Sequence, residues 1–541
     1  MKRLGQQRQL LPPHRRQPCQ HSSRLGNELV LQSLGGLMMF GLRRSRLVMG
    51  SVLGAVFVIA VSAPAPAQPT AHASVGEDTS TTRAFTDALA YRLQFRRMFD
   101  FLSDDPAHIV ALMVTGGDDE ARAVLGLEMS ESEWAEVRRR EEVLARAIDV
   151  KRMVTGLPLD AVSESEESPY RRSSMGPLFA GVWQDQMDGG RLKLAVTDAS
   201  ALDQGSLFAL LPRGGEDLLV IEQRYSLDEL RAWRDTIHSY LVEHSIHASI
   251  GFNYSDEGVR LRLSLYPASH DADLTDLLAS VPAGEVLVEY AEAAPELLNL
   301  PASSHNEADQ QAGLQVGIHW PSTSKLCTWG ISGHTDTYAY VVTAGHCTTG
   351  YGTSISGWGL RYVTQNRNSA FVISTQPSAF TYARLYDSAA TFDHARISAP
   401  YADTNCYHGT PTNPNAHCVH PITSRLSLYG HTVGQIVCAS LGLTNDYHCG
   451  TVVDTDWTGE IEGHYTVNRV KVDEFEADHG DSGSGMVRYN KLHGLLTGGV
   501  PGQYILFEQA YWVKAYIGAS SFDFNFVPSG SWWASCPVVY S

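Results

Sequence analysis

The chain has 541 residues, of which 43% are hydrophobic and 18% are charged. This length exceeds one ordinary hydrophobic core and predicts two or three soluble domains. The formal net charge is −18, although the first 47 residues are basic. Because no stripe of Lys and Arg follows these residues, we expect no nucleic-acid partner.

The first 73 residues have the order of a secretory signal peptide. Three arginines between residues 43 and 46 precede an apolar run over 47–63, and small-residue cleavage motifs follow at 65–67 and 71–73. A membrane anchor is the alternative, but the run is shorter than the roughly 20 residues that a spanning helix needs. We therefore expect a leader over residues 1–73, with its core at about 38–73, a secreted extracellular protein and no stable membrane partner.

The middle of the chain alternates helical and strand patterns. Amphipathic helices are predicted over 82–102, 131–152 and 226–243, and strand hairpins over 179–196 and 246–266. Ser226, followed three residues later by Glu229, predicts the start of the third helix. Because this stretch holds neither cysteine nor a cluster of catalytic residue types, we expect an α/β domain over residues 74–300 that serves as a folding partner.

A different pattern follows. Residues 301–313 are polar and lack periodicity, which predicts an exposed linker with a processing site. Residues 314–541 show many short strand patterns separated by turn residues, and a single helix is expected over 511–517. Such a pattern predicts an all-β barrel or sandwich.

Seven of the eight cysteines lie after residue 326, as expected of an exported domain held by disulfides. We expect the pairs Cys327–Cys347 and Cys438–Cys449. Histidines near Cys406 and Cys418 also allow a zinc site, but a local Cys406–Cys418 disulfide is favoured in an oxidising compartment. We therefore expect no metal and no cofactor, and Cys536 is left without an assigned partner.

Two short motifs contain residue types that are suited to catalysis. Thr343-Ala344-Gly345-His346-Cys347 offers a base, and Gly480-Asp481-Ser482-Gly483-Ser484-Gly485 offers a serine in a glycine-rich turn. Acyl transfer to a serine hydroxyl needs such a base, backbone N–H groups for the oxyanion, and a carboxylate that orients the base. Asp393 is our candidate for the carboxylate, because it opens an alternating apolar strand pattern, and Asp387 is the runner-up.

These motifs, in the order His346, Asp393, Ser482, resemble those of the chymotrypsin-like serine peptidases. Residues 437–452 are similar to a disulfide hairpin of the secreted streptogrisin and α-lytic protease branch, and residues 179–196 resemble that branch's propeptide. Two features depart from the branch: no cysteine occurs over 474–479, and Ser484-Gly485 stands where Gly-Pro is common.

The resemblance implies a double β-barrel protease domain over residues 314–541, preceded by a propeptide that assists its folding. It implies a His346, Asp393, Ser482 triad, an oxyanion hole formed by the N–H groups of Gly480 and Ser482, and a substrate-binding strand at Thr497, Gly498 and Gly499. Glu476 and Asp478 either line a pocket for a basic substrate side chain or face solvent.

The function we expect is that of a secreted serine endopeptidase made as a zymogen, with protein or peptide substrates. Its other partner would be its own propeptide, and we expect a monomer. The alternative is a catalytically inactive protein of the same fold that binds peptides or associates with the cell wall.

Overall fold

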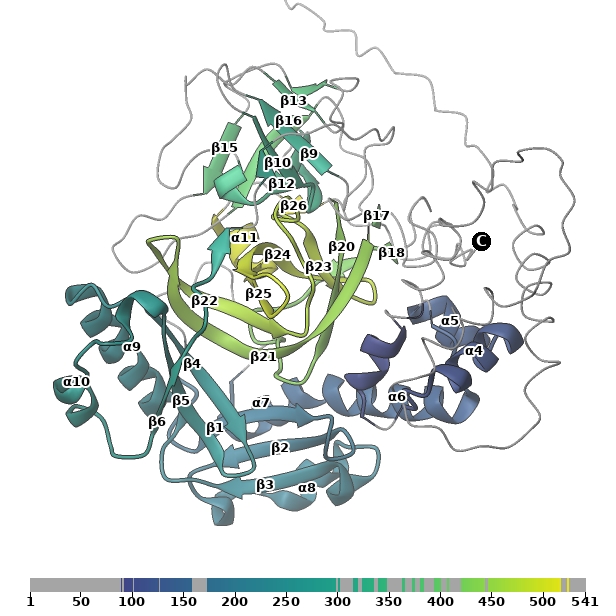
Figure 1. Ribbon diagram of the computed structural model, residues 1–541. Helices are drawn as coiled ribbons and strands as arrows, with labels where there is room; N and C mark the ends of the chain where they lie inside the picture. The colour runs from purple at the N-terminus through teal and green to yellow at the C-terminus, as the bar shows by residue number, and fades with distance from the viewer. Residues whose placement is uncertain are drawn as a thin grey trace, which may run out of the picture. The chain divides into compact units, whose positions relative to one another are not determined.

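Figure 1 shows a computed structural model of the chain. The structure describes residues 89, 92–100, 102–125, 127–157, 173–297, 300–301, 315–319, 324–334, 339–347, 362–364, 372–374, 380–383, 394–399, 406–407, 420–442, 446–516 and 523–524. All of them belong to one compact unit, Thr79–Tyr540. The predicted leader lies outside them, as does nearly all of the predicted linker. Within the described part of the chain, no helix is both long enough and apolar enough to span a membrane.

Residues 89–291, which we call the amino-terminal module, mix helices and strands as predicted. Residues 92–97 are helical. The named helices are α4 (Pro106–Thr115), α5 (Asp119–Leu125), α6 (Glu131–Ala145), α7 (Ala147–Thr155), α8 (Gln204–Ala209), α9 (Leu227–Glu243) and α10 (Thr275–Ala279). The strands are β1 (Phe179–Asp185), β2 (Arg191–Val196), β3 (Leu218–Glu222), β4 (Ala248–Ser255), β5 (Gly258–Leu265) and β6 (Val286–Tyr290).

Local signals explain several of these boundaries. Before α9, the Ser226 hydroxyl accepts the Glu229 N–H while the Glu229 carboxylate accepts the Ser226 N–H, which completes the predicted capping box. Both predicted hairpins form, as β1–β2 and β4–β5. The single helix predicted over 131–152 is instead two helices that meet at Arg146, the C-cap residue of α6 and the N-cap residue of α7.

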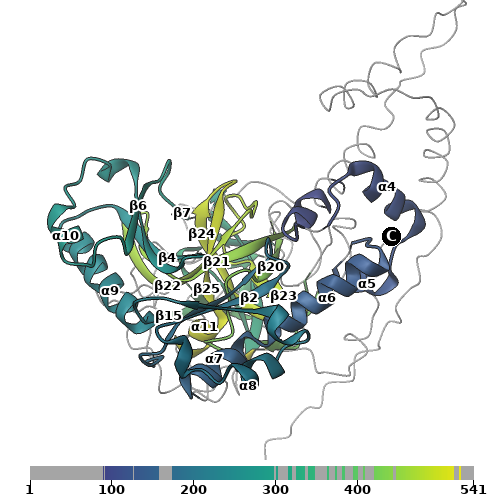
Figure 2. The same cartoon turned by 90° about the horizontal axis from the view of Figure 1, so that it is seen from below.

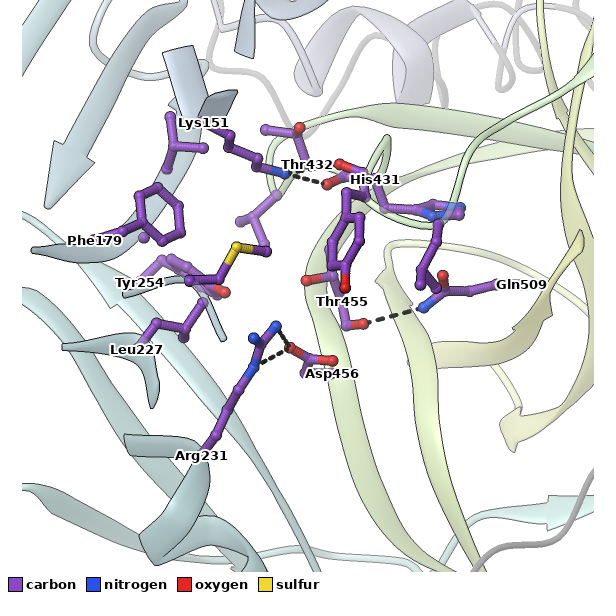
Figure 3. Close-up of a pocket in the computed structure, with 16 residues that line it drawn as sticks. Lys151, Phe179, Leu227, Arg231, Tyr254, His431, Thr432, Thr455, Asp456 and Gln509 are labelled. Carbon is purple, nitrogen blue, oxygen red and sulfur yellow. Dashed lines mark hydrogen bonds and ion pairs between the residues drawn. The ribbon is translucent and has the colours of Figure 1, made fainter. Parts of the chain in front are cut away.

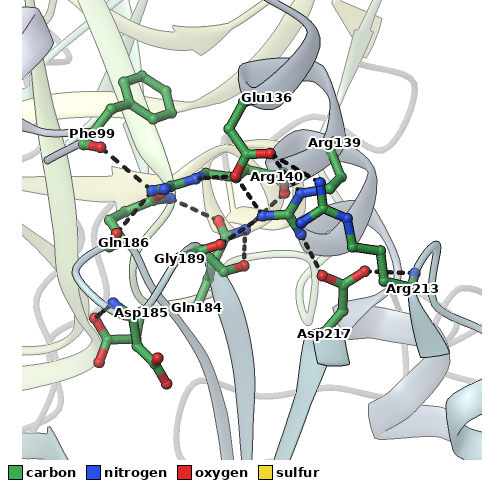
Figure 4. Close-up of polar contacts among 12 residues, drawn as sticks. Phe99, Glu136, Arg139, Arg140, Gln184, Asp185, Gln186, Gly189, Arg213 and Asp217 are labelled. Carbon is green, nitrogen blue, oxygen red and sulfur yellow. Dashed lines mark hydrogen bonds and ion pairs between the residues drawn. The ribbon is translucent and has the colours of Figure 1, made fainter. Parts of the chain in front are cut away.

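A buried network of arginines fastens α6 to the β1–β2 turn (Figure 4). Arg140, 3% exposed, donates to the Gln186 carbonyl at 2.8 Å. Arg139 binds Glu136 at 2.6 Å and also pairs with the buried Asp217. The hydrogen bond from Arg139 is the main cause that lowers the pKa of Glu136 to about 2. Charge pairing thus holds this helix against the sheet.

Residues 315–524, which we call the carboxy-terminal region, are rich in β-structure. Its longer strands are β9 (Gln315–His319), β10 (Ser324–Thr328), β11 (Ile331–His334), β12 (Ala339–Thr343), β15 (Phe380–Ala383), β16 (His394–Ala399), β20 (Ile436–Leu441), β21 (Asp446–Ile461), β22 (His464–Asp473), β23 (Gly485–Arg488), β24 (Lys491–Val500) and β25 (Tyr504–Gln509). Shorter strands are β13 (Tyr362–Thr364), β14 (Val372–Ser374), β17 (Cys406–Tyr407), β18 (His420–Pro421), β19 (Ser424–Arg425) and β26 (Asp523–Phe524). Helix α11 (Ala510–Tyr516) lies within one residue of its predicted position.

The strands of this region form separate sheets. β9, β10, β13 and β14 share one five-stranded sheet with β8 (Leu300–Pro301), and β11, β12, β15, β16 and β26 form another. Strands β20 to β25 belong to an eleven-stranded sheet, which a further short strand, β7 (Glu296–Leu297), joins by pairing with β24. The last third of the chain is therefore β-rich, as its sequence pattern predicts.

The large sheet continues into the amino-terminal module, because β4 pairs with β21 (Figure 1). The two strands approach closely: a Cβ at Gly459 would lie 2.5 Å from the Ser249 Cβ atom. Side chains add to this contact, since the Arg231 guanidinium of α9 binds the Asp456 carboxylate at 2.9 Å (Figure 3). Lys151 of α7 donates to the carbonyls of Tyr429 and His431 (Figure 3).

Candidate active site

Ser482 lies on a tight turn that precedes β23, and its side chain is fully buried. The backbone φ is +107° at Gly480 and +90° at Gly483, a left-handed region that favours glycine. A Cβ at Gly483 would lie 2.2 Å from the Thr343 Oγ1 atom, so there is no room for a side chain. The buried Asp481 carboxylate accepts the Asp478 N–H at 3.0 Å. The turn therefore holds the serine in one position.

His346, the residue predicted to act as the base, precedes Ser482 by 136 residues in the chain but lies next to it in the fold. His346 lies on the short 3-10 helix Gly345–Cys347, directly after β12, and its side chain is 2% exposed. Its Nε2 atom is 2.9 Å from the Ser482 Oγ atom. For the hydroxyl to donate in this contact, Nε2 must be the unprotonated nitrogen, which is the tautomer of a general base.

Strand β10 holds the two motifs together. Cys327 of β10 forms a disulfide with Cys347, the residue after the histidine. Thr328 donates its backbone N–H to the Ser482 carbonyl at 2.7 Å, and its hydroxyl donates to the Gly480 carbonyl at 3.0 Å. The disulfide and these bonds explain how residues so distant in sequence keep hydrogen-bond geometry.

The candidate carboxylates Asp393 and Asp387 lie outside the residues that the structure describes. Strand β16 begins at His394, the residue after Asp393, and pairs with β12 so that Ala395 is opposite Thr343. His346 follows Thr343 by three residues. The role of Asp393 therefore stays a prediction.

Thr497, Gly498 and Gly499, predicted to bind substrate main chain, lie on β24 beside Ser482. The Ser482 hydroxyl also lies within donating distance of the Thr497 carbonyl, at 3.2 Å. Strand β7 lies beside β24 (Figure 2). Gly498 and Gly499 pair with Leu297 and Glu296 of β7 in antiparallel register. The Glu296 carboxylate also lies 3.2 Å from the His479 Nε2 atom. Sequence reasoning missed this contact, because two residues carry no recognisable strand pattern.

The two carboxylates considered for substrate selection do not enter a buried pocket. Glu476 and Asp478 are exposed, whereas the alternate residues Phe475 and Ala477 are buried. Of the two alternatives, the structure thus matches the one in which both carboxylates face solvent.

Two of the three predicted disulfides are present, Cys327–Cys347 and Cys438–Cys449. The third pair includes Cys418, which lies outside the described residues, as does Cys536. Cys327, His346 and Cys347 place three potential metal-ligand atoms within 4.8 Å of one another. Both sulfur atoms are bonded to each other, so this group does not offer thiolate ligands.

No family model matches the chain, and neither does any curated protein. Among solved structures, the chain is similar to the Nocardiopsis protease, with 17% identity and a TM-score of 0.29 over 40% of this chain and all of that chain. Thermobifida fusca protease A shows 18% identity and a TM-score of 0.29 over 41% of this chain and all of its own. Cellulomonas bogoriensis chymotrypsin shows 17% identity and a TM-score of 0.28 over the same shares. These neighbours are chymotrypsin-like serine proteases.

Proposed function

We propose that the chain is the precursor of a secreted serine endopeptidase with a chymotrypsin-like double β-barrel. The observation that carries the proposal is the 2.9 Å contact between His346 Nε2 and Ser482 Oγ, on a turn where Gly483 leaves no room for a side chain. A buried serine that donates to a neutral imidazole is the arrangement that nucleophilic acyl transfer requires.

In the proposed mechanism, His346 takes the Ser482 proton as Oγ attacks a peptide carbonyl. The N–H groups of Gly480 and Ser482 stabilise the oxyanion, and His346 then protonates the leaving amine. Water releases the acyl group from Ser482. Asp393 is proposed to hold the imidazole; the Thr497 hydroxyl, which is fully buried and has no partner among the described residues, is a candidate contact for this carboxylate.

The amino-terminal module is proposed to be the propeptide. Its β4 extends the sheet of the carboxy-terminal region, and β7 covers the edge of β24 next to Ser482. An occupied substrate edge would keep the enzyme inactive until the chain is processed, as in a zymogen. We propose that the precursor is exported through its leader and processed by its own active site.

The test is hydrolysis of a quenched-fluorescent casein by the full chain, secreted from an oxidising host. We expect Ser482→Ala and His346→Ala each to lower kcat by about 10⁶-fold, while far-ultraviolet circular dichroism stays unchanged. Equal activity in the parent and Ser482→Ala proteins would contradict the proposal. A folded parent without activity would favour the alternative, an inactive binding protein of the same fold.

A further inference from the structure

Thr328, the last residue of β10, contacts the nucleophile turn through both its backbone and its side chain. The residue is fully buried. Its backbone N–H donates to the Ser482 carbonyl at 2.7 Å, and its hydroxyl donates to the Gly480 carbonyl at 3.0 Å. Thr328 therefore binds the carbonyls of the same two residues whose N–H groups are proposed to receive the oxyanion.

The bond from the hydroxyl fixes one peptide group of the turn. The peptide between Gly480 and Asp481 is held at its carbonyl by the Thr328 hydroxyl. It is held at its other end by the Asp478 carbonyl, which accepts the Asp481 N–H at 3.1 Å. Because a peptide group is planar, holding its carbonyl and its N–H fixes the direction of both.

A second peptide group is fixed in the same way. The peptide between Ser482 and Gly483 is held by the Thr328 N–H at its carbonyl and by the Leu496 carbonyl, which accepts the Gly483 N–H at 2.8 Å. The peptide that carries the Ser482 N–H lies between these two fixed groups in the chain. Its orientation therefore depends on both, and Thr328 contributes to each of them.

Gly480 needs such a bond more than another residue would. Its φ is +107°, and a glycine has no Cβ atom to limit rotation about its backbone bonds. The Gly480 carbonyl and the Gly480 N–H lie on either side of these bonds. Holding the carbonyl in place therefore limits how far the N–H can turn away from the nucleophile.

A contact on the other side of the hydroxyl sets its direction. The Gly442 N–H, directly after β20, donates to the Thr328 Oγ1 atom at 3.2 Å. Strand β20 is joined to β21 by the Cys438–Cys449 disulfide. A hydroxyl has one proton to donate and can accept as well, so Thr328 accepts from the hairpin and donates to the turn.

We propose that the Thr328 hydroxyl is a positioning group for the oxyanion hole. By holding the Gly480 carbonyl, it keeps the N–H groups of Gly480 and Ser482 directed at the point where the oxyanion forms. This inference rests on the proposed function. Thr328 acts through Gly480 and transfers no proton, so it is a positioning residue.

The proposal predicts which kinetic constant changes. Negative charge on the substrate oxygen develops only as Ser482 attacks, so N–H groups that are misdirected weaken the transition state more than the bound substrate. Loss of the Thr328 hydroxyl should therefore lower kcat and leave KM nearly unchanged. The contact between His346 and Ser482 does not involve this hydroxyl, so the pH dependence of kcat should stay the same.

The test uses the full chain, secreted from an oxidising host, with quenched-fluorescent casein as the substrate and fluorophosphonate titration to count active molecules. Valine has the shape of threonine without the hydroxyl, and we expect Thr328→Val to lower kcat about 100-fold. Thr328→Ser keeps the hydroxyl and should retain most of the parent kcat.

Thr458→Val is the matched control. Thr458 of β21 is also buried, at 2% exposure, and its hydroxyl donates to the Asp456 carbonyl at 3.5 Å. This variant removes a buried threonine hydroxyl away from the nucleophile turn, so we expect it to keep the parent kcat. An equal loss of kcat in Thr458→Val and Thr328→Val would overturn the inference.

The other outcomes separate the two proposals. Parent kcat in Thr328→Val, a change in KM alone, or an equal loss in Thr328→Ser overturns the inference and leaves the peptidase intact. If Thr328→Val is not secreted, Thr328→Ala should show the same loss of kcat; if neither is secreted while Thr328→Ser is, the hydroxyl serves folding and the inference is overturned. A folded parent that neither hydrolyses casein nor reacts with fluorophosphonate contradicts the proposed function, and the inference fails with it.

Discussion

Two strands from the earlier part of the chain extend the same large sheet, yet they do so very differently. β4 has eight residues, lies against β21, and is backed by the buried contact of Arg231 with Asp456. β7 has two residues, lies against β24, and its one ion pair, Glu296 with His479, is partly exposed. The first contact is thus reinforced by buried side chains. The second depends mainly on main-chain pairing, as the binding of a peptide substrate does.

The largest effect on stability is expected from removing the buried carboxylate of Asp456 on β21. Asp456 is 2% exposed, and its loss leaves the Arg231 charge buried without that partner. We expect Asp456→Ala in the Ser482→Ala background to lower the free energy of unfolding by about 3–5 kcal/mol, measured by urea denaturation. An unchanged midpoint would show that the β4 contact does not stabilise the protein.

A second, smaller effect should appear as a dependence on pH. Asp454 of β21 is buried beneath β4 and accepts the Phe252 N–H, and burial raises its pKa to about 7. Because this pKa is raised, the stabilisation is full below the ordinary range of Asp and is lost as pH rises towards 7. The neighbouring charges are Asp456, Arg231, Arg234 and Lys471.

We therefore expect the unfolding temperature of the Ser482→Ala protein to fall from pH 5 to pH 7.5, and Asp454→Asn to reduce that fall. Differential scanning calorimetry across this range measures both proteins. Parallel profiles for the two proteins would show that Asp454 does not titrate in this interval.

The smallest effect on stability is expected from a change in the contact between β7 and β24. The Glu296 and His479 side chains are 43% and 32% exposed, so their pair is worth about 1 kcal/mol or less. Glu296→Gln should leave the unfolding temperature nearly unchanged. A loss of stability as large as that caused by Asp456→Ala would mean that the β4 and β7 contacts stabilise the protein to the same extent.

Local features of this fold could be predicted because they depend on neighbours in sequence. The capping box at Ser226 and Glu229 and the hairpin turn at Asp188-Gly189-Gly190 are of this type. His346 and Ser482 could also be identified, since chemistry restricts the residue types around a nucleophile, and the structure brings them together at 2.9 Å.

The strand pairings that join the earlier part of the chain to the carboxy-terminal region could not be predicted in the same way. Pairing of β4 with β21 or of β7 with β24 uses main-chain groups that every residue except proline carries, so the sequence holds no local signal for either. The role of Asp393 stays a prediction for another reason: many carboxylates lie between the two motifs, and spacing alone does not select one.

The most direct measurement for the central claim is the mapping of a fluorophosphonate adduct on the secreted protein. Such a reagent bonds only to a serine whose proton a neighbouring base removes. We predict a single adduct, on the peptide that contains Ser482, and its loss in His346→Ala protein that keeps the Cys327–Cys347 disulfide. Absence of labelling in the parent, beside a reactive control, or an adduct on another residue would contradict the assignment of Ser482 as the nucleophile.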